Sequence, residues 1–79
     1  MSELSDTARV ILGIYGDSDI RRNQGFKVMD LILHRTLLST HHQERFSVAV
    51  YQLVERGYLE WGDEYLLLLT DKGYKALNN

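Results

Sequence analysis

Apolar residues recur at helical spacing near the start of the chain. Between Ser5 and Tyr15 they follow the i, i+3, i+4, i+7 pattern that lines one face of a helix, at Ala8, Ile11, Leu12 and Tyr15. Ser5 can accept a hydrogen bond from a free amide at the helix start, and Gly16 can adopt the left-handed conformation that ends a helix. We therefore expect a first helix over residues 5–15.

A second helical pattern follows a polar stretch. Residues 17–25 are rich in turn formers, and the sequence leaves open whether they form a loop or a short helical turn. After them, apolar side chains return at helical spacing, at Phe26, Met29, Ile32 and Leu33. This spacing predicts a second helix from about Phe26 to His34.

The third predicted helix has marked ends. Thr40 and Gln43 stand at capping-box spacing, and Gly57 is a stop signal. Its apolar stripe contains Phe46, Ala49, Val50, Leu53 and Val54. At 100° per residue, the opposite side contains Glu44, Val48, Tyr51, Gln52 and Glu55. This opposite side is expected to face solvent or a partner.

The periodicity changes after Gly57. Residues 58–61 and 65–69 are rich in strand-preferring or buried residues, and they flank the turn-forming sequence Gly62-Asp63-Glu64. They predict a β-hairpin, although the four leucines from Leu66 also fit a helix. Thr70 can cap a last short helix that runs to Leu77.

Composition narrows the class of protein. The chain has 79 residues, of which 44% are hydrophobic and 25% charged, and it has no proline. This predicts one ordered domain over residues 1–79, small enough for a homodimer to add stability. With no cysteine, no signal-like start and no apolar run near the roughly 20 residues of a membrane span, we expect a cytoplasmic protein that does not enter the membrane.

The order of predicted elements resembles a winged helix-turn-helix domain. Residues 53–59, followed by 69–73, resemble the stretch where winged-helix transcription regulators, broadly the MarR-like and PadR-like families, leave the recognition helix, build the wing and start the closing helix. The resemblance covers residues 40–77. It implies an α+β, mostly helical fold with a three-helix core, a C-terminal hairpin wing and a short closing helix, but the same fold also serves in protein–protein interaction.

Charge mapping favours DNA as the partner, despite a formal net charge of −2. Between residues 20 and 45, five basic residues stand against two acids, in the part of a helix-turn-helix that faces phosphates. The predicted function is therefore a transcription regulator that reads the major groove of double-stranded DNA with the helix from about Thr40 to Arg56. The candidate DNA-binding residues are Arg21, Arg22, Lys27, Arg35, His41, His42, Arg45 and Gln52.

An alternative is a winged-helix module that binds protein and not DNA. Regulators of this kind often place a basic residue at the wing tip, whereas this predicted tip is acidic through Asp63 and Glu64. Val48 and Tyr51 put apolar surface on the outer side of the third helix, as at protein interfaces. A third alternative pairs two copies through the first or last helix, with Tyr74 and Leu77, on a palindromic site.

No constellation predicts an enzyme, a cofactor or a metal site. His41 and His42 are adjacent, so they point about 100° apart on a helix, and no second ligand follows either at i+4. Asp30 and His34 lie one helical turn apart, but no nucleophile is evident beside them. The start Asp17-Ser18-Asp19 lacks the glycine and terminal glutamate of a calcium loop.

Overall fold

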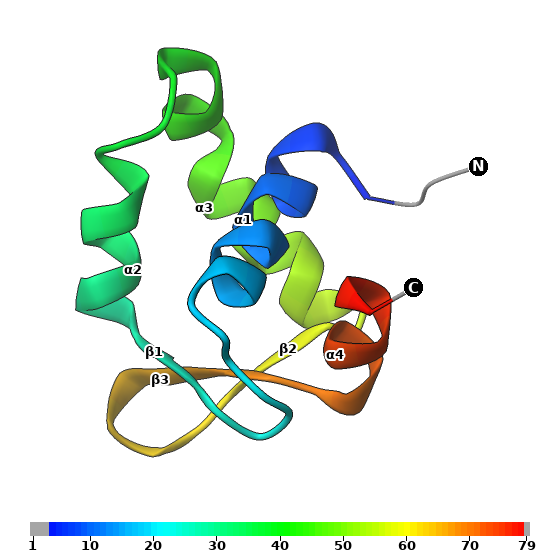
Figure 1. Cartoon of the computed structure of the whole chain (residues 1–79). Helices are drawn as coiled ribbons and strands as arrows, with labels where there is room; N and C mark the ends of the chain where they lie inside the picture. The colour runs from blue at the N-terminus through cyan, green and yellow to red at the C-terminus, as the bar shows by residue number, and fades with distance from the viewer. Residues whose placement is uncertain (1–3, 79) are drawn as a thin grey trace.

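The computed structural model describes residues 4–78, which form an α+β fold made mostly of helix (Figure 1). In chain order the elements are α1 (Asp6–Asp17), β1 (Gly25–Lys27), α2 (Val28–Arg35), α3 (Thr40–Glu55), β2 (Leu59–Trp61), the 3₁₀ turn η1 (Asp63–Tyr65), β3 (Leu66–Leu69) and α4 (Asp71–Leu77). Helix α1 lies in front of α3, α2 stands to one side of them, and the sheet lies beneath all three. The predicted order of helices and hairpin is confirmed.

Helix α1 begins as predicted but ends two residues later. The Ser5 hydroxyl accepts a hydrogen bond from the amide of Ala8, which confirms the N-cap. Gly16 lies inside the helix, and Asp19 takes the left-handed conformation in its place, with φ of 56°. The amide of Ile20 then donates to the carbonyl of Tyr15. This Schellman arrangement forms at Asp19 because aspartate tolerates left-handed backbone better than most residues.

The second helix starts later than the sequence predicts. Phe26 lies in β1, a strand that pairs antiparallel with β3 opposite Leu67, and α2 begins at Val28. Gly25 allows this pairing because a Cβ at that position would collide with the carbonyl oxygen of Leu67. The Phe26 ring packs edge-on against Tyr15, with 4.8 Å between ring centroids. The sequence did not predict this strand, because three residues are too few to show the alternating pattern of a strand.

Helix α3 spans the predicted segment, but the capping box predicted at its start is wrong, because it does not form. Ser39 is the N-cap residue, and no side chain there bonds a helix amide. Gln43 instead donates from Nε2 to the carbonyl of Leu38 at 2.8 Å, which ties the α2–α3 turn to the helix. At the other end, Gly57 has φ of 82°, as the predicted stop requires, and the amide of Tyr58 donates to the carbonyl of Leu53 at 2.9 Å.

The predicted hairpin is confirmed, and β1 extends it into a three-stranded sheet of order β1-β3-β2. Strands β2 and β3 pair antiparallel, with Leu59 opposite Leu69 and Trp61 opposite Leu67. The turn between them contains Glu64, with φ of 56°, and Tyr65, with φ of 62°. The hydroxyl of Thr70 then accepts a hydrogen bond from the amide of Gly73, which confirms the predicted cap of α4.

One apolar core joins the helices to the sheet. Helices α1 and α3 pack against each other, and alternate side chains of β3 point into the same interior. The buried apolar residues are Ala8, Ile11, Leu12, Tyr15, Leu31, Phe46, Ala49, Leu53, Leu59, Leu67 and Leu69. Among the helices described between residues 4 and 78, none combines the length and apolar character needed to cross a membrane.

Candidate functional site

The outer side of α3 has an apolar centre and acidic flanks. Val48 is 72% exposed and Tyr51 is 69% exposed, and the two side chains lie three residues apart on the face opposite Phe46, Ala49 and Leu53. Glu44 precedes Val48 by one helical turn, and Glu55 follows Tyr51 by one turn. Both glutamates are exposed. A helix face of this kind offers a partner an apolar contact bounded by negative charge.

Helix α2 also turns most of its apolar residues outward. Of the four positions whose spacing predicted the helix, Met29 is 67% exposed, Leu33 is 64% exposed and Ile32 is 41% exposed. Leu31 is the fully buried side chain of α2. The reason is geometric: the face of α2 that meets α3 is the one with Leu31. The exposed apolar residues of α2 therefore lie outside the core.

Two shallow hollows lie between α2 and the elements next to it. One, of about 180 Å³, runs between α2 and α3 and is lined by Val28, Leu31, Ile32, Phe46, Ser47 and Val50. The other, of about 480 Å³, lies between the start of α2 and the hairpin tip and is lined by Lys27, Val28, Met29, Glu64 and Tyr65. Val28 lines both hollows. The apolar lining thus continues from the α2–α3 groove to the hairpin.

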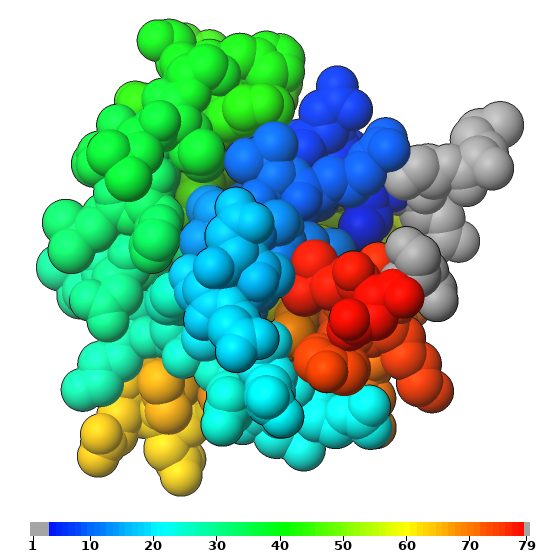
Figure 2. Space-filling view, in the orientation of Figure 1, coloured from blue at the N-terminus to red at the C-terminus, as the bar shows by residue number. Residues whose placement is uncertain are grey.

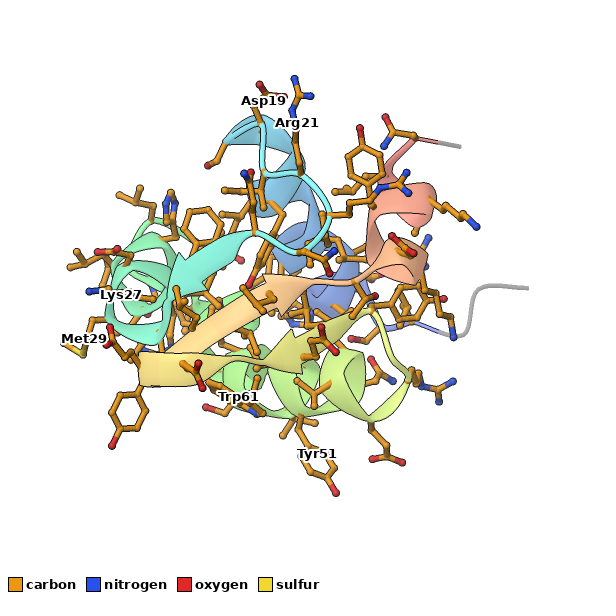
Figure 3. The ribbon with its side chains drawn as sticks, turned by 90° about the horizontal axis from the view of Figure 1, so that it is seen from below. Asp19, Arg21, Lys27, Met29, Tyr51 and Trp61 are labelled. Atoms are coloured by element: carbon orange, nitrogen blue, oxygen red, sulfur yellow. The ribbon has the colours of Figure 1, made fainter. Side chains whose placement is uncertain are left out.

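Two aromatic side chains of the hairpin are exposed. Trp61 of β2 is 54% exposed, and Tyr65 at the tip is 78% exposed. In Figure 3, Trp61 and Tyr51 project from the same side of the molecule. The tip itself protrudes from the surface in the space-filling view (Figure 2). Sequence reasoning singled out Val48 and Tyr51 but not Met29, Trp61 or Tyr65. A tryptophan in a short predicted strand was the signal that could have pointed to an exposed aromatic there.

The predicted basic residues do not gather on one face. Figure 3 places Arg21 at the edge of the molecule opposite Tyr51. Arg22, in the same loop, bonds Asp71 at 3.4 Å and lies over the ring of Tyr74, 5.0 Å from its centroid. The loop that contains Arg21 and Arg22 packs near α4. In Figure 2 the cyan atoms of this loop lie against the orange and red atoms of α4. The arginines of the α1–β1 loop are therefore separated from the outer face of α3.

The other basic candidates are spread along α2 and α3. Lys27 is exposed beside the hairpin tip. Arg35 is partly buried, and its Nε donates to the carbonyl of Gln43 at 3.2 Å. His41 and Arg45 are exposed one turn apart at the start of α3, with 3.0 Å between Nδ1 of His41 and Nη1 of Arg45. These last two form the one compact basic pair that sequence analysis placed on α3.

Two further candidates contact α1. Nδ1 of His42 lies 2.7 Å from the hydroxyl of Thr7, which is 1% exposed, so a hydrogen bond joins α3 to α1. Oε1 of Gln52 accepts a hydrogen bond from the amide of Ser5 at 3.2 Å. Both side chains are partly buried. Their contacts give them a structural role at the α1–α3 contact.

Tyr74 and Leu77 of α4 pack against the core of their own chain. Both are partly buried, and Leu77 lies next to Gly16 of α1. This placement leaves them less apolar surface for a second copy than Val48 and Tyr51 have. A dimer that pairs through the last helix, as the sequence predicted, would therefore have little exposed apolar surface to bury.

The buried phenol of Tyr15 is hydrogen-bonded within the fold. Burial raises the pKa of the Tyr15 phenol above its usual range, but its hydroxyl is occupied by the carbonyl of Leu67. Within residues 4–78, no group of three or more His, Asp or Glu side chains is placed to hold a metal ion. Comparisons with models of protein families, with curated proteins and with solved structures find no match.

Proposed function

We propose that the chain is a winged-helix domain that binds another protein through the outer face of α3. The element order supports the winged-helix assignment, since three helices precede an antiparallel hairpin and a short capped helix closes the chain. Within this arrangement α3 holds the position of a recognition helix. Its exposed side chains decide what kind of partner it suits.

The observation that most supports a protein partner is which residues lie at the centre of the exposed face of α3. A helix that enters the major groove presents side chains that bond base edges, with basic residues toward the phosphates. Here the centre consists of Val48 and Tyr51, and Glu44 and Glu55 stand one turn away on either side. Phosphates would repel these carboxylates. A protein surface would instead cover the valine and the tyrosine and leave the charges at the rim.

The neighbouring elements enlarge the apolar surface. Tyr51, Trp61 and Tyr65 are between 54% and 78% exposed. An aromatic side chain buries about 150–250 Å² when fully covered, so these three rings together expose on the order of 400 Å². Tyrosine and tryptophan are the residue types most enriched where binding energy concentrates. Such a surface favours a protein partner over solvent.

The test is capture of partners from cells that express the chain, by a crosslinker attached next to α3. We expect one defined partner, which includes a second copy of the chain, to be crosslinked to the natural chain. The Tyr51→Ala variant should lose this partner, and Arg21→Ala, on the opposite edge, should keep it. Equal capture by both variants would show that α3 is not the binding surface.

DNA reading is the second candidate, and His41 with Arg45 is the observation that favours it. Both side chains are exposed in the first two turns of α3, where the helix N-terminus adds positive potential. On this proposal the tip, with Asp63 and Glu64, stays away from the phosphates. Binding then depends on α3 and on Lys27, without a contribution from the wing.

A further inference from the structure

We infer that the partner protein places an extended, arginine-rich segment against α3 and the neighbouring edge of β2. The inference rests on the proposed function, because it gives the chemistry of the protein that α3 binds. The surface consists of Val48, Tyr51 and Trp61, with Glu44 and Glu55 at its borders, and is called the α3–β2 strip below. Its open side, its charges and the backbone of β2 each favour this kind of segment.

The ring of Trp61 is open on the side of the sheet that carries the core. Trp61 lies directly opposite Leu67, and directly opposed residues of two strands point their side chains to the same face. Leu67 is 0% exposed, whereas Trp61 is 54% exposed. Strand β2 is an edge strand in the order β1-β3-β2, and Trp61 projects on the same side as Tyr51 (Figure 3). The core side of the sheet is therefore uncovered at this edge.

Tyr51 and Arg45 lie on different flanks of α3. At 100° per residue, Tyr51 falls about 40° from Ser47, which lines the hollow toward α2. Arg45 falls about 20° from Gln52, whose side chain accepts a hydrogen bond from Ser5 at the start of α1. The tyrosine and the arginine are thus about 120° apart around the helix. The positive charge of Arg45 lies toward α1 and away from the α3–β2 strip.

Carboxylates stand at both ends of the helical part of the strip. Glu44 precedes Val48 by four residues and Glu55 follows Tyr51 by four residues, and both glutamates are exposed. They are about 16 Å apart along the helix axis. The salt bridges described between residues 4 and 78 involve neither glutamate. A cationic group of a partner can therefore pair with each of them without breaking an ion pair inside the chain.

These charges also select among the possible occupants. In an antiparallel pair of α3 helices, Glu44 of one copy meets Glu55 of the other, and in a parallel pair each glutamate meets its own counterpart. Like charges that face one another disfavour association of two copies. The phosphates of a nucleic acid are repelled for the same reason. A positively charged protein segment is the occupant that the two carboxylates attract.

Arginine suits the strip better than lysine because the strip combines aromatic rings with carboxylates. A guanidinium stacks on the face of a tryptophan or tyrosine ring and forms bidentate pairs with a carboxylate. Elsewhere in this fold one arginine makes both kinds of contact at once. The guanidinium of Arg22 lies 5.0 Å from the ring centroid of Tyr74, and its Nη1 lies 3.4 Å from Asp71. The strip offers the same two contacts to an arginine of the partner.

The backbone at the edge of β2 favours an extended segment. The amide of Gly62 donates to the carbonyl of Leu66, and the amide of Thr70 donates to the carbonyl of Tyr58. Bonding groups alternate along an antiparallel strand, so the amide and carbonyl of Trp61 point away from β3 and toward the open edge. A strand added at this edge turns every second side chain to the side where the Trp61 ring lies.

Trp61 is the single tryptophan of the chain, so its fluorescence reports on the strip directly. The full chain is titrated at about 100 mM salt with a synthetic peptide of about nine residues that alternates arginine and valine and is capped at both ends. The strip is smaller than a standard interface, so we expect a Kd of about 10–100 µM. The lysine version should bind at least about threefold more weakly. The glutamate version should not bind, and methylation of the backbone nitrogens should weaken binding at least about tenfold.

Variants of the chain test the named side chains. Glu44→Gln together with Glu55→Gln should weaken binding of the arginine peptide about fivefold, because two exposed ion pairs are lost. Tyr51→Ala should weaken it about tenfold. The matched control is Asp17→Asn with Asp19→Asn, which also removes two carboxylates. Asp19 lies at the edge opposite Tyr51 in Figure 3, so this control should leave binding unchanged. Circular dichroism confirms that each variant is folded.

Absence of a fluorescence change at about 1 mM arginine peptide overturns the inference. Equal binding of the glutamate or methylated peptide overturns it too, as does equal binding by the variant without the two glutamates. A change that appears when the chain alone is concentrated assigns the strip to a second copy, and a change with duplex DNA that the glutamine variant strengthens assigns it to nucleic acid. The proposed function survives these results if Tyr51→Ala still loses the captured partner, and it fails if that capture is unaffected.

Discussion

The hydroxyl of Tyr15 donates a hydrogen bond to the carbonyl oxygen of Leu67 over 2.8 Å, although 52 residues separate the two in sequence. Both residues are 0% exposed. Leu67 stands in the middle strand of the sheet, opposite Phe26 on one side and Trp61 on the other. This single contact therefore fastens α1 to the centre of the sheet.

Replacement of Tyr15 by phenylalanine should lower the free energy of unfolding by about 1–2 kcal/mol, because a buried carbonyl loses its side-chain donor while the ring packing is kept. Urea denaturation followed by circular dichroism measures the change. The control is Tyr65→Phe, since Tyr65 is 78% exposed. A loss of equal size in both variants would contradict the role assigned to the buried hydrogen bond.

The same phenol predicts a pH dependence. Its pKa in the folded chain is raised by burial, above the value of about 10 expected in the unfolded chain. The folded state then holds a proton that the unfolded state releases, so the stabilisation is complete below about pH 10 and is lost as pH rises through the folded pKa. Denaturation curves between pH 9 and 11 should show a steeper loss for the natural chain than for Tyr15→Phe. Parallel curves would show that Tyr15 does not contribute.

Two glycines should respond to alanine in opposite ways. Gly57 has φ of 82°, where a Cβ is strained, so Gly57→Ala should destabilise the chain by about 1–2 kcal/mol. Gly13 lies inside α1, and a Cβ there would meet no atom within 4 Å. Gly13→Ala should therefore stabilise by about 0.5–1 kcal/mol. Thermal unfolding of the two variants measures both effects, and shifts of the same sign would contradict this assignment.

Much of the fold followed from local sequence. Helical spacing defined α1 and α3, the predicted caps at Ser5 and Thr70 marked the starts of α1 and α4, and the glycine at position 57 marked the change from helix to strand. Strand β1 could not be predicted in this way, because Phe26 continues the helical spacing of α2. In the folded chain Phe26 instead pairs with the edge of β3 that β2 does not occupy. The long-range contact of Gly25 with Leu67 has no local signal.

The candidate surface was predicted less completely. The opposite faces of α3 follow from its periodicity, so Val48 and Tyr51 were identified, and Phe46, Ala49 and Leu53 were placed in the core. The exposure of Met29 depends on which side of α2 meets α3, which is set by tertiary packing. The separation of Arg21 from α3 likewise depends on the path of the loop before β1. A count of charges along the chain does not contain this information.

His42 should contribute to stability more than to binding. Because its Nδ1 lies 2.7 Å from the hydroxyl of the buried Thr7, His42→Ala should cost about 1–2 kcal/mol by leaving that hydroxyl without this partner. Thr7→Val in the same chain should recover part of the loss, since the valine needs no hydrogen bond. Denaturation of the two single variants and the double variant gives the coupling energy. Additive losses would show that the two side chains are independent.

A salt-dependent titration with random-sequence duplex DNA separates the two candidate functions. The protein-binding proposal predicts no measurable affinity at about 150 mM salt, because Glu44 and Glu55 flank the centre of α3 and the hairpin tip is acidic. If DNA is instead bound at low salt, the affinity should fall steeply with rising salt, and the double change His41→Ala with Arg45→Ala should abolish it. Glu64→Lys is the matched change at the tip, and on the DNA reading it should leave binding nearly unchanged, because the tip stays away from the phosphates. Tight binding that survives the double change would exclude α3 as the DNA-reading element, and tight binding that it abolishes would replace the protein-binding proposal by DNA recognition.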